Sequence, residues 1–137
     1  MKPAFALHAQ LAADTFEVGR LDLSRVLLMN DSRHPWLILV PERASLVELV
    51  DLTPGELHRL ADEIRRASHA LQELFKPDKL NVAALGNVVP QLHVHVIARF
   101  RNDAAWPRPV WGSPPAPPYP TAAAAKRIND MRGALRL

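Results

Sequence analysis

The sequence predicts an α+β fold, with an antiparallel sheet of about five strands, one long helix packed on one face and a short C-terminal helix. Three observations predict this fold class: short apolar runs that flank turns, one long amphipathic helix with clear ends, and a sharp change of composition after Asp103. The chain has 137 residues, of which 48% are hydrophobic. It is therefore long enough to form one domain with a real core.

Composition restricts both the chemistry and the partners. The chain has no cysteine, which excludes disulfides, thiolate nucleophiles and cysteine zinc sites. A net charge of +3 suits a phosphate-bearing ligand or an ordinary solvated surface. Lys and Arg are scattered rather than clustered, so we expect no nucleic-acid partner. There is no apolar run of roughly 18 residues and no signal-peptide pattern, so we expect no membrane partner and a cytoplasmic location.

Two apolar runs around a turn predict the first pair of antiparallel strands, over residues 21–30 and 36–40. The turn lies at residues 30–32, where Asn, Asp and Ser favour bonds to their own backbone. Pro41 closes the second strand. A short helix is predicted earlier in the chain, over residues 5–13.

The clearest helix spans Pro54–Phe75. Thr53 is a suitable N-cap, Pro54 occupies the first helical position, and Glu56 completes a capping box. Lys76 and Pro77 end the helix. Its histidines, His58 and His69, are predicted to lie on the surface. The predicted core-facing stripe has helical spacing and consists of Leu57, Leu60, Ala61, Ile64, Ala67, Leu71 and Leu74.

A second strand pair is predicted over residues 80–85 and 91–100, joined through a turn at Gly86 and Asn87. We place the domain at residues 1–104 and an extension at residues 105–137. Seven of the 13 prolines fall within residues 105–120, which excludes a central strand or a helix there. The aromatic residues of this segment indicate that it packs on its own domain, a partner subunit or a ligand. The chain then ends in a predicted amphipathic helix, Thr121–Leu135.

Gln91, His93 and His95 alternate with apolar residues along the last predicted strand. Alternate side chains of a strand share a face, so these three side chains would form a row while their neighbours enter the core. The row has three interpretations: an exposed polar face, a metal site, or nucleophilic and acid–base chemistry on a phosphate. The metal site would need a third ligand, and no nearby cysteine or acidic residue supplies it.

The segment GNVVPQLHVHVI at residues 86–97 resembles the signature of the histidine triad (HIT) family. That signature is His-φ-His-φ-His-φ-φ, where φ is apolar, preceded at a short fixed distance by a glycine and a polar amide residue. The order of the elements over residues 15–105 resembles the family as well. The resemblance implies a HIT-like fold that binds nucleotides, and a homodimer whose sheets join and whose helices meet.

The resemblance also implies roles for individual residues. His93 occupies the middle position, where the histidine attacks the α-phosphorus of a nucleotide and carries a nucleotidyl intermediate. His95 occupies the third position and would contact the phosphate. Gly86 and Asn87 match the residues before the motif that bind the phosphate or leaving group, and Asn30 matches an asparagine of the nucleotide pocket. Apolar side chains near Leu28, Leu39 and Ile97 would help to build the base pocket.

Two positions depart from the family pattern. The first triad position holds Gln91, whose amide can form hydrogen bonds but cannot titrate. Trp36 stands at the strand position of the family's upstream histidine, and His34, two residues earlier, is either its substitute or loop surface. A glutamine at the first position resembles a bacterial branch often described as diadenosine polyphosphate hydrolase-like. The WPRPVWG segment at residues 106–112 resembles that branch too.

The resemblance implies a nucleotidyl hydrolase or transferase that acts on purine dinucleoside polyphosphates or nucleoside phosphoramidates, with Gln91, His93 and His95 as catalytic residues. His93 would displace the leaving group, and water would then release the nucleotide. We expect a backbone carbonyl to hold the other ring N–H of His93, and His95 to stabilise the phosphoryl oxygens. No metal and no cofactor is required. The alternative is a nucleotide-binding or scaffold protein that kept the fold but lost efficient turnover.

Overall fold

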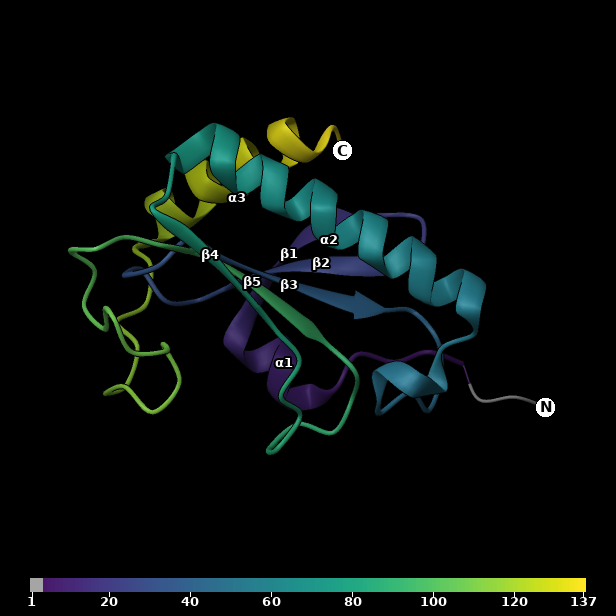
Figure 1. Ribbon diagram of the computed structural model, residues 1–137. Helices are drawn as coiled ribbons and strands as arrows, with labels where there is room; N and C mark the ends of the chain where they lie inside the picture. The colour runs from purple at the N-terminus through teal and green to yellow at the C-terminus, as the bar shows by residue number, and fades with distance from the viewer. Residues whose placement is uncertain (1–3) are drawn as a thin grey trace.

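A computed structural model describes residues 4–137 and shows a five-stranded antiparallel sheet with helices on both faces (Figure 1). The two longer helices cover one face of the sheet, and the short first helix lies against the other (Figure 1). The predicted α+β fold is confirmed. The elements in chain order are α1 (Ala9–Asp14), β1 (Thr15–Arg20), β2 (Ser24–Met29), β3 (Trp36–Pro41), the 3-10 turn η1 (Leu49–Asp51), α2 (Pro54–Phe75), β4 (Lys79–Ala83), β5 (Val94–Arg99) and α3 (Thr121–Leu135).

The strand order is β1-β2-β3-β5-β4, which places β3 at the centre and β1 and β4 at the edges. The β4–β5 pair is antiparallel, as the sequence predicts. Strand β1 lies in a segment where the sequence analysis predicts no strand. Its pairing with β2 shifts register between Glu17 and Gly19, and this irregularity interrupts the alternation that marks a strand.

Helix α2 has the bounds that its end signals predict. The Thr53 hydroxyl accepts a hydrogen bond from the Glu56 backbone, and the Glu56 side chain accepts one from the Thr53 backbone. The predicted stripe is only partly right, because Leu57 and Ala61 are exposed while Glu63 is buried. The Glu63 carboxylate accepts a 2.7 Å hydrogen bond from the backbone N–H of Leu23, which explains a buried acid on the core-facing side.

The central strands of the sheet are buried on both faces, which excludes the interpretation of the histidine row as an exposed polar face. One core lies between the sheet and helices α2 and α3 and includes Val94 and Val96. A second core lies on the opposite face, where Trp36 and Ile97 pack with Leu11 of α1 and with Val110 from the Pro-rich segment. Every residue of β3 and β5 is therefore buried. His93 and His95 are enclosed, with exposed fractions of 7% and 5%.

The C-terminal extension contributes to both cores. Met131 and Leu135 of α3 are buried against α2 and the sheet, while Val110 and Trp111 pack on the opposite face. The backbone N–H of Tyr119 donates to the Asn30 side chain at 2.8 Å, which fixes the end of the Pro-rich segment next to β2. The segment thus packs on its own domain, one of the three locations left open by the sequence.

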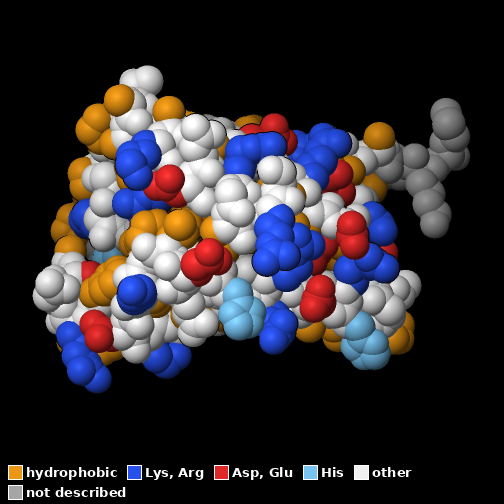
Figure 2. All heavy atoms as spheres, turned by 90° about the horizontal axis from the view of Figure 1, so that it is seen from above, with side chains coloured by type: hydrophobic (Ala, Val, Ile, Leu, Met, Phe, Trp, Pro, Cys, Tyr) orange, Lys and Arg blue, Asp and Glu red, His pale blue; other side chains and the backbone are white. Residues whose placement is uncertain are grey.

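Acidic and basic side chains are interspersed on the helical side of the molecule, which Figure 2 views from above. His58 and His69 are exposed on α2, as predicted. None of the helices within residues 4–137 is both long enough and apolar enough to cross a membrane.

Candidate active site

The motif histidines lie at the start of β5 rather than in one continuous strand. Strand β5 begins at Val94, so the segment from Gln91 to His93 precedes it. The backbone N–H of Leu92 donates to the Leu46 carbonyl at 2.9 Å, so this segment bonds a loop instead of β4. The predicted strand over residues 91–100 is therefore too long at its beginning, and the predicted row of three side chains does not form.

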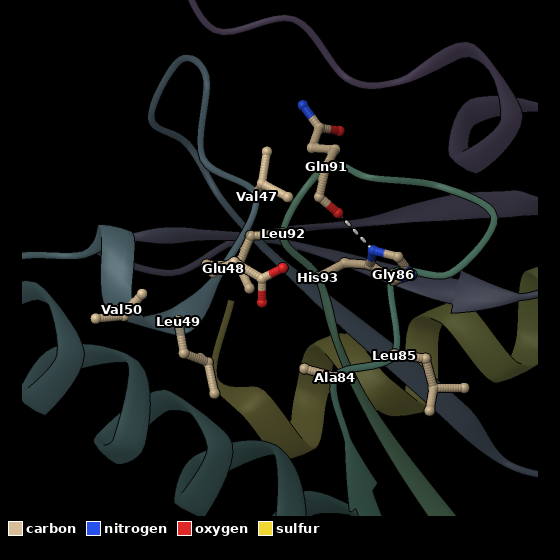
Figure 3. A pocket seen from close by; sticks show the side chains of 10 residues that line it. All are labelled: Val47, Glu48, Leu49, Val50, Ala84, Leu85, Gly86, Gln91, Leu92 and His93. Atoms are coloured by element: carbon tan, nitrogen blue, oxygen red, sulfur yellow. Dashed lines mark hydrogen bonds between the residues drawn. The ribbon is translucent and has the colours of Figure 1, made fainter.

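Gln91 uses its side chain to hold the N-terminal segment. Its amide nitrogen donates to the Ala6 carbonyl and its amide oxygen accepts from the His8 backbone N–H, both at 2.9 Å. The His8 ring then accepts from the Gln10 backbone N–H and caps α1. Figure 3 shows the Gln91 side chain extending away from His93. Both groups of the amide are thus engaged in placing the segment that leads into α1.

The backbone of Gln91, in contrast, fixes the ring of His93. The Gln91 carbonyl lies 2.6 Å from His93 Nδ1, and this contact is the dashed line in Figure 3. A carbonyl can only accept, so Nδ1 carries the proton. In the neutral ring, Nε2 then holds a free lone pair, which is the form required of a nucleophile. A backbone carbonyl was expected in this role.

His95 is fixed as the opposite tautomer. The indole Nε1–H of Trp36 donates to His95 Nδ1 at 3.0 Å, so His95 carries its proton on Nε2. Burial, and secondarily the neighbouring His93, lower the pKa of His95 to about 3. His95 is therefore a neutral hydrogen-bond donor at physiological pH. Trp36, which departs from the family pattern, supplies the hydrogen bond that sets this state.

The two histidines line a shared cavity of about 500 Å³. Their ring centroids lie 4.9 Å apart, and the Trp111 ring lies 5.1 Å from His95 at a steep angle. Gly86, whose φ of 72° lies in the left-handed region, and Asn87 line the same cavity. The remaining wall includes Gln10, Leu11 and Asp14 of α1 and Met29 at the end of β2. An imidazole with an unprotonated Nε2, a neutral donor, an apolar wall and polar groups thus meet in one cavity, as in many small-molecule sites.

Asn30 and Leu28 do not line this cavity. The Asn30 side chain is engaged by the Tyr119 backbone, and Leu28 is fully buried in the core beneath α2. Adjacent strand residues point to opposite faces, so Met29 rather than Leu28 reaches the cavity. Leu39 likewise lies in the core beneath α2, whereas Ile97 packs on the face that carries Trp36.

The comparisons with known proteins decide the family. The family model described as "HIT domain" matches residues 10–102, about two thirds of the chain. The chain belongs to the HIT family. A bis(5'-nucleosyl)-tetraphosphatase (asymmetrical) from Schizosaccharomyces pombe is 32% identical over 104 residues, which cover 69% of this chain and 57% of that protein. The chain therefore spans less than two thirds of the length of this relative.

Solved structures of histidine triad proteins superimpose on nearly the whole chain. One from Bradyrhizobium japonicum is 49% identical, with a TM-score of 0.94, and the match covers 97% of this chain and 99% of the other. One from Marinobacter aquaeolei VT8 is 46% identical, with a TM-score of 0.95 and 98% of each chain covered. One from Sinorhizobium meliloti 1021 is 42% identical, with a TM-score of 0.93, covering 95% of this chain and 96% of the other. All three matches extend through the C-terminal region beyond residue 102.

A buried charge network anchors the C-terminal extension to the HIT domain. The Arg99 guanidinium bonds the Asp103 carboxylate at 2.8 and 3.1 Å, the Asn81 side chain at 2.8 Å and the Arg108 carbonyl at 2.8 Å. Asp103 also accepts backbone hydrogen bonds from Phe100, Ala105 and Trp106. Burial alone would raise the pKa of Asp103, but these hydrogen bonds and the charge of Arg99 hold it well below its usual range.

His34 belongs to the surroundings of this network and not to the His93 cavity. It is 1% exposed, and its Nδ1 lies 3.8 Å from the Asp103 carboxylate. Burial lowers its pKa, although Asp31 and Asp103 oppose the shift. His34 is therefore neither loop surface nor positioned to act on a ligand beside His93.

His93 also lines a second cavity, which is drawn in Figure 3. Glu48 contributes its carboxylate, while Val47, Leu49, Val50 and Leu85 give the wall an apolar character. These four side chains are 41–85% exposed in the single chain. Within residues 4–137, no group of three His, Asp or Glu side chains is arranged to hold a metal ion.

Proposed function

We propose that this HIT protein is a nucleotidyl hydrolase or transferase that acts at the α-phosphate of dinucleoside polyphosphates through a covalent nucleotidyl-His93 intermediate. The observation that carries the proposal is the pair of opposite tautomers in one cavity: His93 with Nε2 unprotonated and His95 with Nε2 protonated. The similarity to a bis(5'-nucleosyl)-tetraphosphatase supports this class of substrate.

In the first step, the Nε2 lone pair of His93 attacks the α-phosphorus, and the P–O bond to the leaving phosphate breaks with its electron pair on that oxygen. The neutral His95 donates a hydrogen bond to a phosphoryl oxygen as charge develops there. Water then attacks the same phosphorus, and the P–N bond returns its electrons to His93. The water proton passes to solvent, and a nucleoside monophosphate is released.

The environment of Gln91 favours polyphosphates over phosphoramidates. An amine leaving group needs a proton as its bond to phosphorus breaks, and an amide does not titrate near neutral pH. A polyphosphate leaves as an anion and needs no such donor. The Gln91 amide is also directed to Ala6 and His8, away from the His93 ring.

The product pattern tests this proposal. Attack at the α-phosphorus converts diadenosine tetraphosphate into AMP and ATP, whereas cleavage in the middle of the chain gives two ADP. We expect purified protein to give AMP and ATP, separated by ion-exchange chromatography. A stoichiometric burst of adenylylated protein without turnover would instead favour the alternative, a nucleotide-binding protein with lost turnover. The observation behind that alternative is that position 91 holds a glutamine instead of a histidine.

Gln91 offers a separate prediction. Replacing it with alanine removes both hydrogen bonds to the N-terminal segment, which leads into the α1 wall of the cavity. We expect KM for diadenosine tetraphosphate to rise about fivefold, with kcat nearly unchanged, because a smaller fraction of molecules has a formed cavity. Gln72→Ala, an exposed glutamine on α2, is the matched control and should change neither constant.

The Gln91→His variant tests whether the first motif position acts on the leaving group or positions the N-terminal segment. If the first position acts on the leaving group, this variant should raise kcat and change the pH profile while KM stays constant. If Gln91 instead positions the N-terminal segment, the variant should resemble Gln91→Ala. Steady-state kinetics of Gln91→Ala, Gln91→His and the Gln72→Ala control separate the two roles. The measurements should run from about pH 5.5 to about pH 8.5, a range that includes the ordinary His pKa of about 6.5.

We further propose a homodimer formed through the edge strand β4. Val82 on this strand and Val88 after it are 47% and 88% exposed, and the exposed apolar side chains around the Glu48 cavity add to them. Exposed apolar surface of this kind marks interaction sites. Sedimentation equilibrium at micromolar concentration should give twice the mass of the chain, and Val82→Lys should shift the species toward monomer. A monomeric wild-type protein would contradict the proposal.

A further inference from the structure

A third cavity, of about 240 Å³, lies where the Pro-rich segment meets the turn after β2. Arg33 from that turn and Arg108 from the Pro-rich segment both line it, together with Ser113. Two guanidinium groups and a hydroxyl are donors suited to phosphate oxygens. The side chains come from segments 75 residues apart in the sequence, so the fold rather than local sequence brings them together.

Arg33 is held in place by its neighbours. Its Nε and Nη2 bond the two oxygens of Asp31 at 3.0 and 2.9 Å, and Nη2 also reaches the Pro114 carbonyl at 3.3 Å. Burial alone would raise the pKa of Asp31, but the hydrogen bonds and charge of Arg33 hold it below its usual value, so the pair is ionised at neutral pH. The carboxylate compensates most of the Arg33 charge and fixes the guanidinium at the cavity wall.

Arg108 supplies a charge without such compensation. Within residues 4–137, no carboxylate lies within 4.0 Å of its side-chain nitrogens, so it forms no ion pair there. Its backbone carbonyl accepts a 2.8 Å hydrogen bond from the buried Arg99, which fixes the position from which the side chain extends. With Arg33 and Asp31 nearly cancelling, the cavity carries a net positive charge from Arg108 and favours an anion.

This cavity adjoins the one that contains His93. Trp111 and Gly112 line both, so the same two residues form the boundary between them. The Trp111 ring also packs 5.1 Å from His95, on the side of the site where a phosphate on His93 would meet its hydrogen-bond donor. A positively charged cavity beside a phosphate-reacting site is suited to the phosphates of the substrate that extend beyond the reacting phosphorus.

We propose that the Arg33–Arg108 cavity is the subsite for the phosphates of the leaving group. This inference rests on the proposed function and adds a substrate preference to it. The enzyme would select substrates whose leaving group carries two or more phosphates. Adenylyl groups bound to leaving groups without phosphate would leave the cavity empty. Selectivity for polyphosphates would then come from binding at Arg108 as well as from the absence of a proton donor at Gln91.

The test compares substrates that share the adenylyl group and differ in the leaving group. Diadenosine tetraphosphate carries phosphates into the cavity, and adenosine 5'-phosphoramidate carries none. We expect Arg108→Ala to lower kcat/KM about tenfold on the first substrate and less than about twofold on the second. Arg108→Lys should recover part of the loss. Arg101→Ala, which removes an exposed arginine outside the cavity, is the control for net charge and should affect neither substrate.

Calorimetry of inorganic triphosphate binding tests the anion subsite independently of the proposed function, because it requires no turnover. If the wild-type protein turns over neither nucleotide, the proposed function fails, while a roughly tenfold weaker triphosphate affinity of Arg108→Ala still supports the anion subsite. Unchanged triphosphate affinity in Arg108→Ala would overturn the inference. So would an equal loss of kcat/KM on both nucleotides, because a leaving-group subsite cannot act on a substrate that does not reach it.

Discussion

Replacing Asp103 with asparagine should lower the free energy of unfolding by about 3 kcal/mol, because it leaves the buried Arg99 without its counter-charge. The two side chains are 2% and 4% exposed, and Asp103 accepts five hydrogen bonds from the side chain and backbone around it. Asparagine has nearly the same shape but presents an NH2 group to donors, so both the charge and part of the hydrogen bonding are lost. Urea denaturation at pH 7 measures the change.

The chain provides a matched control for this variant. Lys126 and Asp130 on α3 form an ion pair with the same four-residue spacing and the same 2.8 Å distance, but their side chains are 78% and 38% exposed. Asp130→Asn should therefore cost only about 0.3–0.5 kcal/mol. Equal losses of unfolding free energy in the two variants would show that burial does not increase the contribution of the Arg99–Asp103 pair to stability.

The loss in Asp103→Asn should also depend on pH. The folded-state pKa of Asp103 is lowered from its ordinary value of 3.8, so its ionisation stabilises the fold above that value. This contribution is lost as the pH falls below 3.8 toward the lower folded-state pKa. The wild type and Asp103→Asn should therefore converge in stability under acid conditions. A stability difference that stays constant between about pH 7, well above the ordinary Asp pKa, and about pH 2, well below it, would contradict the assignment.

His93→Asn should lower the rate of nucleotidyl transfer by on the order of 10³-fold or more, because it removes the only imidazole in the cavity with a free Nε2 lone pair. Asparagine is preferable to alanine because His93 is buried and donates to the Gln91 carbonyl, a bond that the amide NH2 can replace. His69→Asn on the surface of α2 controls for the substitution itself and should retain full activity.

Stability must be measured alongside activity. The edge-to-face contact between the His93 and His95 rings means that a smaller side chain also loosens packing. If His93→Asn unfolds at the same urea concentration as the wild type but is inactive, the result supports His93 as the nucleophile. Full activity in a folded His93→Asn protein would show that the histidines only form part of the second core.

Local signals account for the elements that the sequence predicts well. The cap at Thr53 and the proline at position 77 are short-range features, and they set the ends of α2 at the predicted residues. The irregular register of β1 near Gly19 has no comparably clear pattern. The burial of Glu63 depends on the Leu23 backbone, 40 residues away in the sequence, and periodicity alone therefore misplaced it.

Part of the candidate site can likewise be predicted from local sequence, while the rest depends on tertiary contacts. The motif identifies His93 and His95, and the carbonyl partner of His93 follows from the chemistry of a nucleophilic imidazole. The roles of Gln91 and Trp36 depend on contacts with Ala6, His8 and His95, which become neighbours only in the folded chain. At both departures from the family pattern, the partners of the side chain are therefore set by tertiary contacts that the residue type alone does not reveal.

The most direct test of the account is to identify the residue that carries the nucleotide during turnover. Protein mixed with diadenosine tetraphosphate, quenched rapidly in alkaline denaturant and digested, should yield one adenylylated peptide by mass spectrometry, with the adenylyl group on His93. The adduct should be absent from His93→Asn and should disappear from the wild type as substrate is exhausted. An adenylyl group on His95 or on any other residue, or turnover that continues in His93→Asn, would contradict the central claim that His93 is the nucleophile.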